Sequence, residues 1–222
     1  MIRAFIFDQD GVLIDSDQYH YLALKQVLNS VGIAITLNEY TDVCLGKNTE
    51  HNIRYFLTNN NQYGNVLESL VSQKRRIYNE LVKKEATPMR GVIAALQCLT
   101  QYDMKLGVAS SSHQQAVDVV LDQLGLTSVF DVVAHAGMVS ELKPSPEIYL
   151  LAADLLGINP QECIAVEDSN VGLESAISAG MRAMMVSNIN DQRRKFPRAS
   201  WILSSLEDLT PSFLESKILC IL

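Results

Sequence analysis

Two pairs of carboxylates follow short apolar runs of the sequence. Asp8 and Asp10 follow the run AFIF, and Glu167 with Asp168 follows the run IAV. If these side chains meet, a cation must compensate them, because two unit charges about 4 Å apart repel by about 4 kcal/mol at an effective dielectric constant of about 20. The set contains hard oxygen ligands and no His or Cys, which favours Mg²⁺. We expect Asp8 and Asp168 to be the metal ligands.

Two further motifs supply positive charge and hydrogen-bond donors for an anion. Lys143 lies in LKPSPEIY, where Pro144 restrains it at the entrance to a predicted helix, and it can neutralise one phosphate oxygen. The hydroxyl of Ser110 and the backbone amides of the SSS turn that contains Ser111 precede another predicted helix, where an anion prefers to bind. These residues predict a site that binds a phosphoryl group.

The same residues fit phosphoryl transfer, which needs positioning, charge stabilisation and a nucleophile in line with the leaving oxygen. The carboxylate of Asp8 can attack phosphorus and form an aspartyl phosphate. Asp10, turned toward the same crevice by Gly11, can protonate the leaving alcohol and later activate water. A lone D-x-D pair more often marks a turn or a helix cap, so this prediction depends on all the motifs occurring together.

Alternating strands and helices position these motifs. Buried strands are predicted at 4–7, 106–109, 129–134, 164–166 and 183–186. Amphipathic helices are predicted between them, at 92–99, 114–124, 146–156 and 171–179. This alternation predicts a parallel sheet, and ligands of such sheets bind beyond the carboxyl ends of the strands, where the candidate residues lie.

One long segment lacks strand signals. From residue 17 to about residue 85 the pattern is helix after helix. The simplest explanation is an insert: a helical cap domain at residues 16–85, and an α/β core domain made of residues 1–15 plus 86–222. The predicted fold class is therefore α/β, with a Rossmann-like parallel-sheet core and an inserted all-helical cap domain.

Composition excludes several classes of protein. The 222 residues are 48% hydrophobic and 19% charged, which is typical of a globular protein. The net charge of −7, without a long basic block, argues against a nucleic-acid partner. The basic cluster at 74–76 favours a solvated helix face, with a cationic lid over an anionic substrate as the alternative.

The cysteines and the apolar runs indicate the cellular setting. Cysteines 44, 98, 163 and 220 lack the spacing of a zinc site and are expected to be reduced thiols, mostly buried. The sequence shows no signal-peptide pattern and no apolar stretch of about 18 residues. We expect a cytoplasmic protein without a membrane partner, and a monomer.

The motifs DQDGVLIDS, VASSS, KPSPEIY and VEDSNVGLESAISAGM, in this order, resemble those of the haloacid dehalogenase superfamily over nearly the whole chain. An insert between the first two motifs is similar to the helical-cap branch, which contains β-phosphoglucomutases and phosphatases of small metabolites. The resemblance implies that Asp10 is the acid/base and also binds the metal through its carbonyl. The other implied roles are nucleophile and metal ligand for Asp8, phosphoryl binding for Ser110 and Lys143, metal binding for Asp168, and support of the metal site for Glu167.

The resemblance also implies substrate-binding residues in the insert. His20 matches a histidine near the active site of the mutases, although a lone helical histidine more often packs or faces solvent. Gly46 and Lys47 match the cap segment that selects substrates. The mutases usually have Lys-Gly-Val-Ser-Arg there, with the arginine gripping a second phosphate, whereas this chain has LGKNT at 45–49. Both cationic positions are changed, which favours hydrolysis.

We therefore predict a Mg²⁺-dependent phosphatase that hydrolyses a small phosphorylated metabolite, for example a sugar phosphate, through an aspartyl phosphate on Asp8. Asp10 favours phosphate-ester chemistry, because the resemblance implies that true dehalogenases lack this acid and that ion-pumping ATPases carry threonine there. The first alternative is a sugar-phosphate mutase of the β-phosphoglucomutase type. The second is a phosphometabolite-binding protein without catalytic activity.

Overall fold

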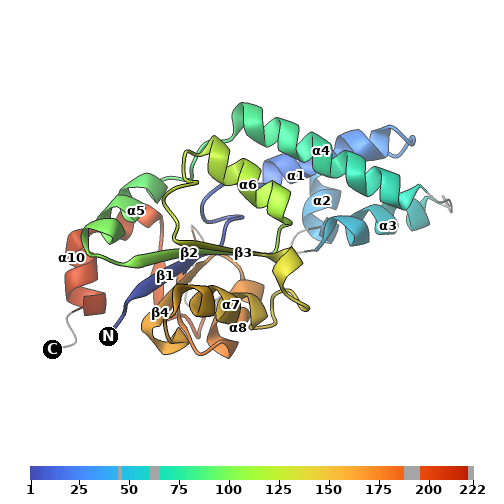
Figure 1. Cartoon of the computed structure of the whole chain (residues 1–222). Helices are drawn as coiled ribbons and strands as arrows, with labels where there is room; N and C mark the ends of the chain where they lie inside the picture. The colour runs from blue at the N-terminus through green and yellow to red at the C-terminus, as the bar shows by residue number, and fades with distance from the viewer. Residues whose placement is uncertain (45–46, 61–65, 188–195, 220–222) are drawn as a thin grey trace. The chain divides into compact units, whose positions relative to one another are not determined.

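The structure is a computed structural model of the whole chain, and it describes residues 1–44, 47–60, 66–187 and 196–219. The chain forms two compact units. One, called the core unit here, consists of Met1–Asp15 and Thr87–Leu222; the other, called the cap unit, consists of Ser16–Ala86. Figure 1 shows strands in the core unit and helices in the cap unit.

The core unit contains a parallel sheet with the strand order β3-β2-β1-β4-β5-β6. The six strands are β1 (Ala4–Phe7), β2 (Lys105–Ser110), β3 (Val132–His135), β4 (Cys163–Glu167), β5 (Arg182–Val186) and β6 (Trp201–Leu203). Every residue of β1 and β4 is buried, as expected for central strands covered on both faces. The predicted α/β fold with a parallel sheet is confirmed.

Helices cover both faces of this sheet. Figure 1 shows α7 and α8 on one side and α6 on the other. Residues of β1, α7 and α8, including Ile6, Tyr149 and Leu173, share one buried apolar cluster. The helical elements are α5 (Val92–Gln101), α6 (Gln114–Gln123), η1 (Ala136–Met138), α7 (Glu147–Leu156), η2 (Pro160–Glu162), α8 (Asn170–Ser178), η3 (Leu206–Asp208), α10 (Pro211–Phe213) and η4 (Leu214–Leu219).

Two details of the sheet differ from the prediction. The third strand begins at Val132 rather than at residue 129, because Asp131 ends the preceding turn: its carboxylate accepts hydrogen bonds from the Leu106 amide and the Lys105 ammonium. Strand β6 was not predicted. It is only three residues long, too short for a periodic signal, and it is defined by pairing with β5.

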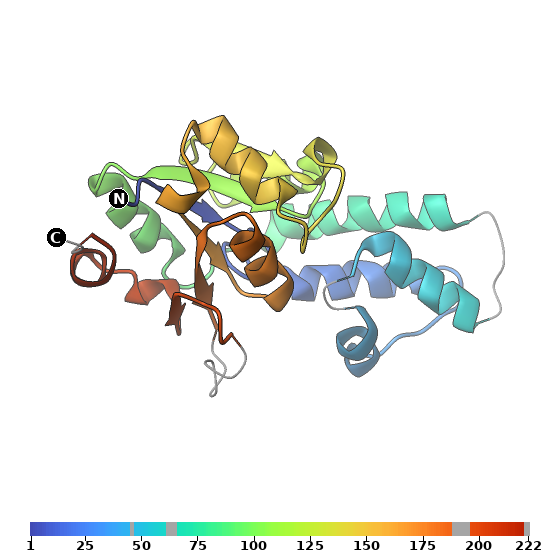
Figure 2. The same ribbon diagram turned by 90° about the horizontal axis from the view of Figure 1, so that it is seen from below.

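The cap unit consists of four described helices: α1 (Asp17–Asn29), α2 (Leu37–Cys44), α3 (Thr49–Asn59) and α4 (Leu67–Glu85). Helices α1 and α4 lie side by side in both views (Figures 1 and 2) and pack through buried side chains such as Leu24 and Tyr78. Among the described residues, no helix combines the length and the apolar character that crossing a membrane requires.

Candidate active site

Asp8 lies at the carboxyl end of β1, between the two strands that flank it. Phe7 pairs with Val108 on one side and with Val166 on the other, and the Asp8 amide donates to the Val166 carbonyl at 2.9 Å. The side chain is nearly buried, and its Oδ1 accepts a hydrogen bond from the Gln9 amide at 2.8 Å. This position holds one carboxylate oxygen rigidly at the edge of the sheet.

The negative charge of Asp8 is poorly compensated. Burial raises the pKa of Asp8 well above its ordinary value, the neighbouring Glu167, Asp10 and Asp168 raise it further, and Lys143 opposes this rise. A carboxylate in this environment gains stability from any additional cation nearby. Carboxylates with a strongly raised pKa beside charged partners are frequent at functional sites.

Lys143 uses all three protons of its ammonium group on protein acceptors. Its Nζ lies 2.9 Å from Asp8 Oδ1, 2.7 Å from Glu167 Oε1 and 2.9 Å from the Ala109 carbonyl oxygen. Burial alone would lower the pKa of Lys143, but the two carboxylates outweigh it and raise the pKa above its ordinary value. Lys143 therefore stays charged. It lies in the loop before α7, which begins four residues later at Glu147.

Glu167 is completely buried at the end of β4, and protein donors occupy both of its oxygens. Oε1 accepts from Lys143 and from the Tyr149 hydroxyl at 2.7 Å each, and Oε2 accepts at 3.3 Å from the Asp168 amide and the Ser169 hydroxyl. Since a carboxylate offers about four acceptor positions, Glu167 has little capacity left for a metal ion. Its contacts fit a supporting role.

Two glycines make room for these carboxylates. A Cβ atom on Gly11 would lie 2.0 Å from Asp168 Oδ2, and Gly11 has a φ of +77°, which side chains rarely allow. A Cβ atom on Gly172 would lie 1.9 Å from Glu167 Cδ. At both glycines the backbone therefore lies so close to an acidic side chain that no larger residue fits without a shift.

The carboxylates fit a hard cation. One oxygen each of Asp8, Glu167 and Asp168 lies within 4.8 Å of the other two, and Glu167 fits a supporting place in this set because protein donors already occupy both of its oxygens. All of these potential ligand atoms are oxygens, which Mg²⁺ and Ca²⁺ prefer and softer metals do not. Burial and the neighbouring acids raise the pKa of Asp8, and a cation bound beside it would stabilise the ionised carboxylate.

The turn after β2 connects Ser110, the serine predicted to bind the phosphoryl group, with Asp10, the second acid of the D-x-D motif. Ser110 is completely buried, and its Oγ accepts a hydrogen bond from the Ser112 amide at 3.1 Å. The Ser112 hydroxyl donates to Asp10 Oδ2 at 2.9 Å. Ser111, in contrast, has an exposed side chain. Asp10 and Ser110 thus belong to one hydrogen-bonded chain.

The predicted cap residues form a separate set in the cap unit. His20 stacks on Tyr78 with ring centroids 4.3 Å apart, and its Nδ1 lies 2.6 Å from Lys74 Nζ. Lys74 is buried, so the expectation of a solvated face at 74–76 is wrong for this residue, although Arg75 and Arg76 are exposed. Lys47 is exposed. Gly46 lies outside the described residues.

Sequence reasoning missed three residues of these networks: Ser112, Tyr149 and Lys74. The first two could have been suspected from their places inside the SSS and KPSPEIY motifs. Lys74 could have been found from its spacing, because it lies on the same helical face as Leu70 and Ile77, both buried. The buried position of Lys74 is overlooked when residues 74–76 are judged by their charge alone.

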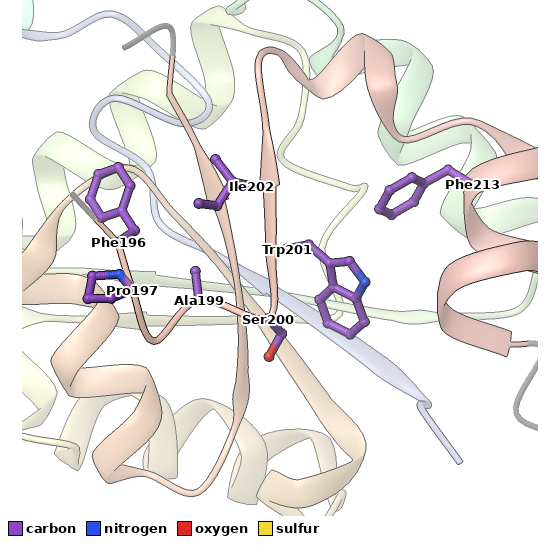
Figure 3. A pocket seen from close by; sticks show the side chains of 7 residues that line it. All are labelled: Phe196, Pro197, Ala199, Ser200, Trp201, Ile202 and Phe213. Carbon is purple, nitrogen blue, oxygen red and sulfur yellow. The ribbon is translucent and has the colours of Figure 1, made fainter. Parts of the chain in front are cut away.

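A cavity of about 400 Å³ lies beside β6 and α10 (Figure 3). Figure 3 shows Trp201 and Phe213 among its lining side chains. Among the described residues, no carboxylate or basic side chain lines it, so the described lining does not indicate phosphoryl chemistry. Its lining consists of Phe196, Pro197, Ala199, Ser200, Trp201, Ile202 and Phe213.

A parallel α/β sheet with a buried carboxylate, a buried lysine and further acids at its carboxyl edge is typical of enzymes of the phosphotransferase type. The sequence pattern of the haloacid dehalogenase-like hydrolases matches residues 5–186. The chain belongs to that family, and the resemblance noted from its motifs is confirmed.

Individual relatives agree with this assignment. The candidate phosphatase YhcW of Bacillus subtilis is 37% identical over 85% of this chain and 84% of its own length. The β-phosphoglucomutase of the same organism is 30% identical over 97% and 95%, respectively. The crystal structure of β-phosphoglucomutase from Clostridium difficile superposes with a TM-score of 0.83 at 30% identity, covering 98% of this chain and 97% of that one.

Proposed function

We propose that this protein is a Mg²⁺-dependent phosphatase of a small phosphorylated metabolite, with Asp8 as the nucleophile. The observation that carries the proposal is the buried cluster in which Lys143 Nζ lies 2.9 Å from Asp8 Oδ1, at the same sheet edge as Asp168. A lysine paired with the nucleophile can bind the phosphoryl group where the nucleophile attacks it.

The chain's own residues account for the proton transfers. An oxygen of Asp8 attacks phosphorus, the bond from phosphorus to the ester oxygen breaks, and Asp10 gives its proton to the departing alcohol. Asp10 then takes a proton from water, whose oxygen attacks the aspartyl phosphate and releases inorganic phosphate and the Asp8 carboxylate. Lys143 and the Ser110 hydroxyl hold the transferring group. Ser112 orients Asp10 through the 2.9 Å hydrogen bond.

The side chains of Asp8 and Asp168, with the backbone carbonyl of Asp10, would hold Mg²⁺. When bound, the ion supplies positive charge that offsets the charge of the phosphoryl group and the carboxylates. Glu167 supports this set indirectly, because it fixes Lys143 on one side and the Asp168 amide on the other.

The name of YhcW and the change in the cap segment favour hydrolysis of a free metabolite. The segment 45–49 has Lys47 as its only cation, whereas a mutase needs a firm grip on the second phosphate of a bisphosphate intermediate. A mutase of the β-phosphoglucomutase type is the second candidate. It is favoured by the similarity over nearly the whole length of the Bacillus subtilis enzyme and by the contact of the half-buried His20 with the buried Lys74.

Turnover of p-nitrophenyl phosphate tests the proposal. We expect release of phosphate in the presence of Mg²⁺, loss of release with EDTA, and recovery when Mg²⁺ is restored. An Asp8→Asn variant should be inactive. Equal rates from both proteins would exclude Asp8 as the nucleophile, and absence of activity with any phosphate ester would favour a binding protein.

A second assay separates the two enzymes. The protein is given β-glucose 1-phosphate with a trace of the 1,6-bisphosphate, and glucose 6-phosphate is measured. We expect hydrolysis to exceed isomerisation. Efficient formation of glucose 6-phosphate would establish the mutase instead. A screen of phosphorylated metabolites would then identify the preferred ester.

Two expectations about the protein's state accompany the proposal. We expect a monomer, which light scattering on a gel-filtration column tests. We also expect it in the cytoplasm, which fractionation of the source cells tests.

A further inference from the structure

Tyr149 contacts both partners of the ion pair that faces the nucleophile. It lies in the first turn of α7 and is completely buried. Its hydroxyl donates to Glu167 Oε1 at 2.7 Å, and the Lys143 ammonium lies 4.9 Å from the centre of its ring. One side chain therefore contacts the carboxylate and the ammonium at once.

The hydroxyl group is costly in this place. A phenylalanine would bury the same ring in the same apolar cluster, whereas a buried hydroxyl loses its water and needs a hydrogen-bond partner. Glu167 is the partner. Burial raises the pKa of Tyr149 well above its ordinary value, and Glu167 raises it further, so the phenol stays protonated and remains a donor.

Lys143 must exchange one hydrogen bond before it can donate to a phosphoryl oxygen. All three of its protons are used, on Asp8, Glu167 and the Ala109 carbonyl. The bond to Asp8 is the natural one to exchange, because a phosphoryl group bound for attack by Asp8 places its own anionic oxygens beside that carboxylate. The exchange succeeds only if Glu167 does not draw the ammonium away from the nucleophile.

We propose that Tyr149 is a positioning residue for Lys143. By donating to the same oxygen, Oε1, that accepts from Lys143, it reduces the attraction of Glu167 for the ammonium and keeps Lys143 turned toward Asp8. This inference rests on the proposed function, since it assigns Tyr149 a part in binding the phosphoryl group that Asp8 receives.

A pair of matched variants tests the inference. Tyr149→Phe removes the hydroxyl and keeps the ring. Tyr102→Phe is the control, because the Tyr102 hydroxyl also donates to a glutamate, Glu215 at 2.5 Å, but in an exposed pair between α5 and η4. Both changes break one bond between a tyrosine and a glutamate, and only the first touches Lys143.

The expected result is a selective loss in the chemical step. For p-nitrophenyl phosphate with saturating Mg²⁺, Tyr149→Phe should lower kcat about tenfold, which corresponds to about 1.4 kcal/mol of transition-state stabilisation, and should change KM less than about twofold. Inhibition by orthovanadate, which resembles the transition state, should weaken by a similar factor. Tyr102→Phe should leave kcat, KM and vanadate inhibition unchanged. A wild-type kcat in Tyr149→Phe, or equal effects of both variants, would overturn the inference.

Crystal structures of the wild-type protein provide a test that needs no variant. With Mg²⁺ and inorganic phosphate bound, the hydrogen bond from Tyr149 to Glu167 and the bond from Lys143 to Glu167 should persist, while Lys143 exchanges Asp8 for a phosphate oxygen. A Lys143 that leaves Glu167 instead would overturn the inference. If the wild-type protein is inactive, or if Asp8→Asn is as active as it, the proposed function fails; an active wild type with an unaffected Tyr149→Phe refutes the role of Tyr149 alone.

Discussion

Replacing Lys143 by methionine should destabilise the protein far more than replacing a surface lysine in an ion pair of the same length. The Lys143 side chain is 5% exposed, and the partners Glu167 and Asp8 are 0% and 13% exposed. Methionine keeps the apolar stem and removes the charge. Two nearly buried carboxylates then lack their cation, and breaking a buried pair in this way costs about 3–5 kcal/mol.

The matched control is Lys105→Met. Lys105 lies 2.7 Å from Asp131, the same distance as between Lys143 and Glu167, but the two side chains are 56% and 36% exposed. Water screens such a pair, so its loss should cost about 0–1 kcal/mol. The two variants therefore differ in burial while the length of the ion pair is held constant.

Urea unfolding at pH 7 in EDTA measures the difference. We expect the free energy of unfolding to fall by about 3–5 kcal/mol in Lys143→Met, a large part of a total stability of about 5–15 kcal/mol, and by less than about 1 kcal/mol in Lys105→Met. Added Mg²⁺ should recover part of the first loss, because it supplies charge beside Asp8. Equal losses in the two variants would refute the reasoning that Lys143 compensates the buried acids.

Three further predictions concern packing and burial. Gly172→Ala should abolish turnover of p-nitrophenyl phosphate and lower the free energy of unfolding in urea by about 1–3 kcal/mol, because the alanine Cβ would collide with the Glu167 carboxyl group. Normal activity of this variant would contradict the prediction. Gln9→Met should raise the free energy of unfolding by about 1–2 kcal/mol, since among the described residues the completely buried side-chain amide of Gln9 has no hydrogen-bond partner; a loss of stability would show that this side-chain amide is bonded, for example to internal water. Burial raises the pKa of Cys44 and Cys163 to about 11, so the folded state favours the protonated thiols. Their contribution to the free energy of unfolding is therefore intact below about pH 8.5 and is lost as the pH rises toward 11. Their reaction with Ellman's reagent at pH 8 should be slow in the folded protein and fast in urea, and fast reaction without urea would contradict their burial.

Much of the fold follows from short apolar runs, because a central parallel strand is buried on both faces and leaves an uninterrupted signal. The first strand was predicted at the same residues at which β1 occurs, and Asp8 follows it directly. Strand β6 could not be predicted, because three residues are too few to show an alternating hydrophobic pattern and because its pairing with β5 depends on the tertiary structure. The same limit applies to Asp131, whose side-chain bonds end a turn inside an apolar run.

The candidate site was predictable where one rule of topology applied. Carboxyl ends of parallel strands share an edge, which brings Asp8 and Asp168 together although 160 positions separate them. The hydrogen bonds that organise the site were not predictable. Tyr149 reaches Glu167 only because α7 packs against the sheet with that face inward, and Lys74 is buried only because α4 packs on α1. Such contacts depend on side-chain direction in three dimensions.

The most direct test of the central claim is to locate the phosphoryl group on the protein during turnover. The protein is mixed with p-nitrophenyl phosphate and Mg²⁺, quenched in acid within milliseconds, digested and mapped by mass spectrometry. A phosphoryl group on the peptide that contains Asp8, absent from Asp8→Asn and from samples with EDTA, is the predicted result. A phosphoryl group on another residue, or hydrolysis that continues in Asp8→Asn, would contradict the claim that Asp8 is the nucleophile.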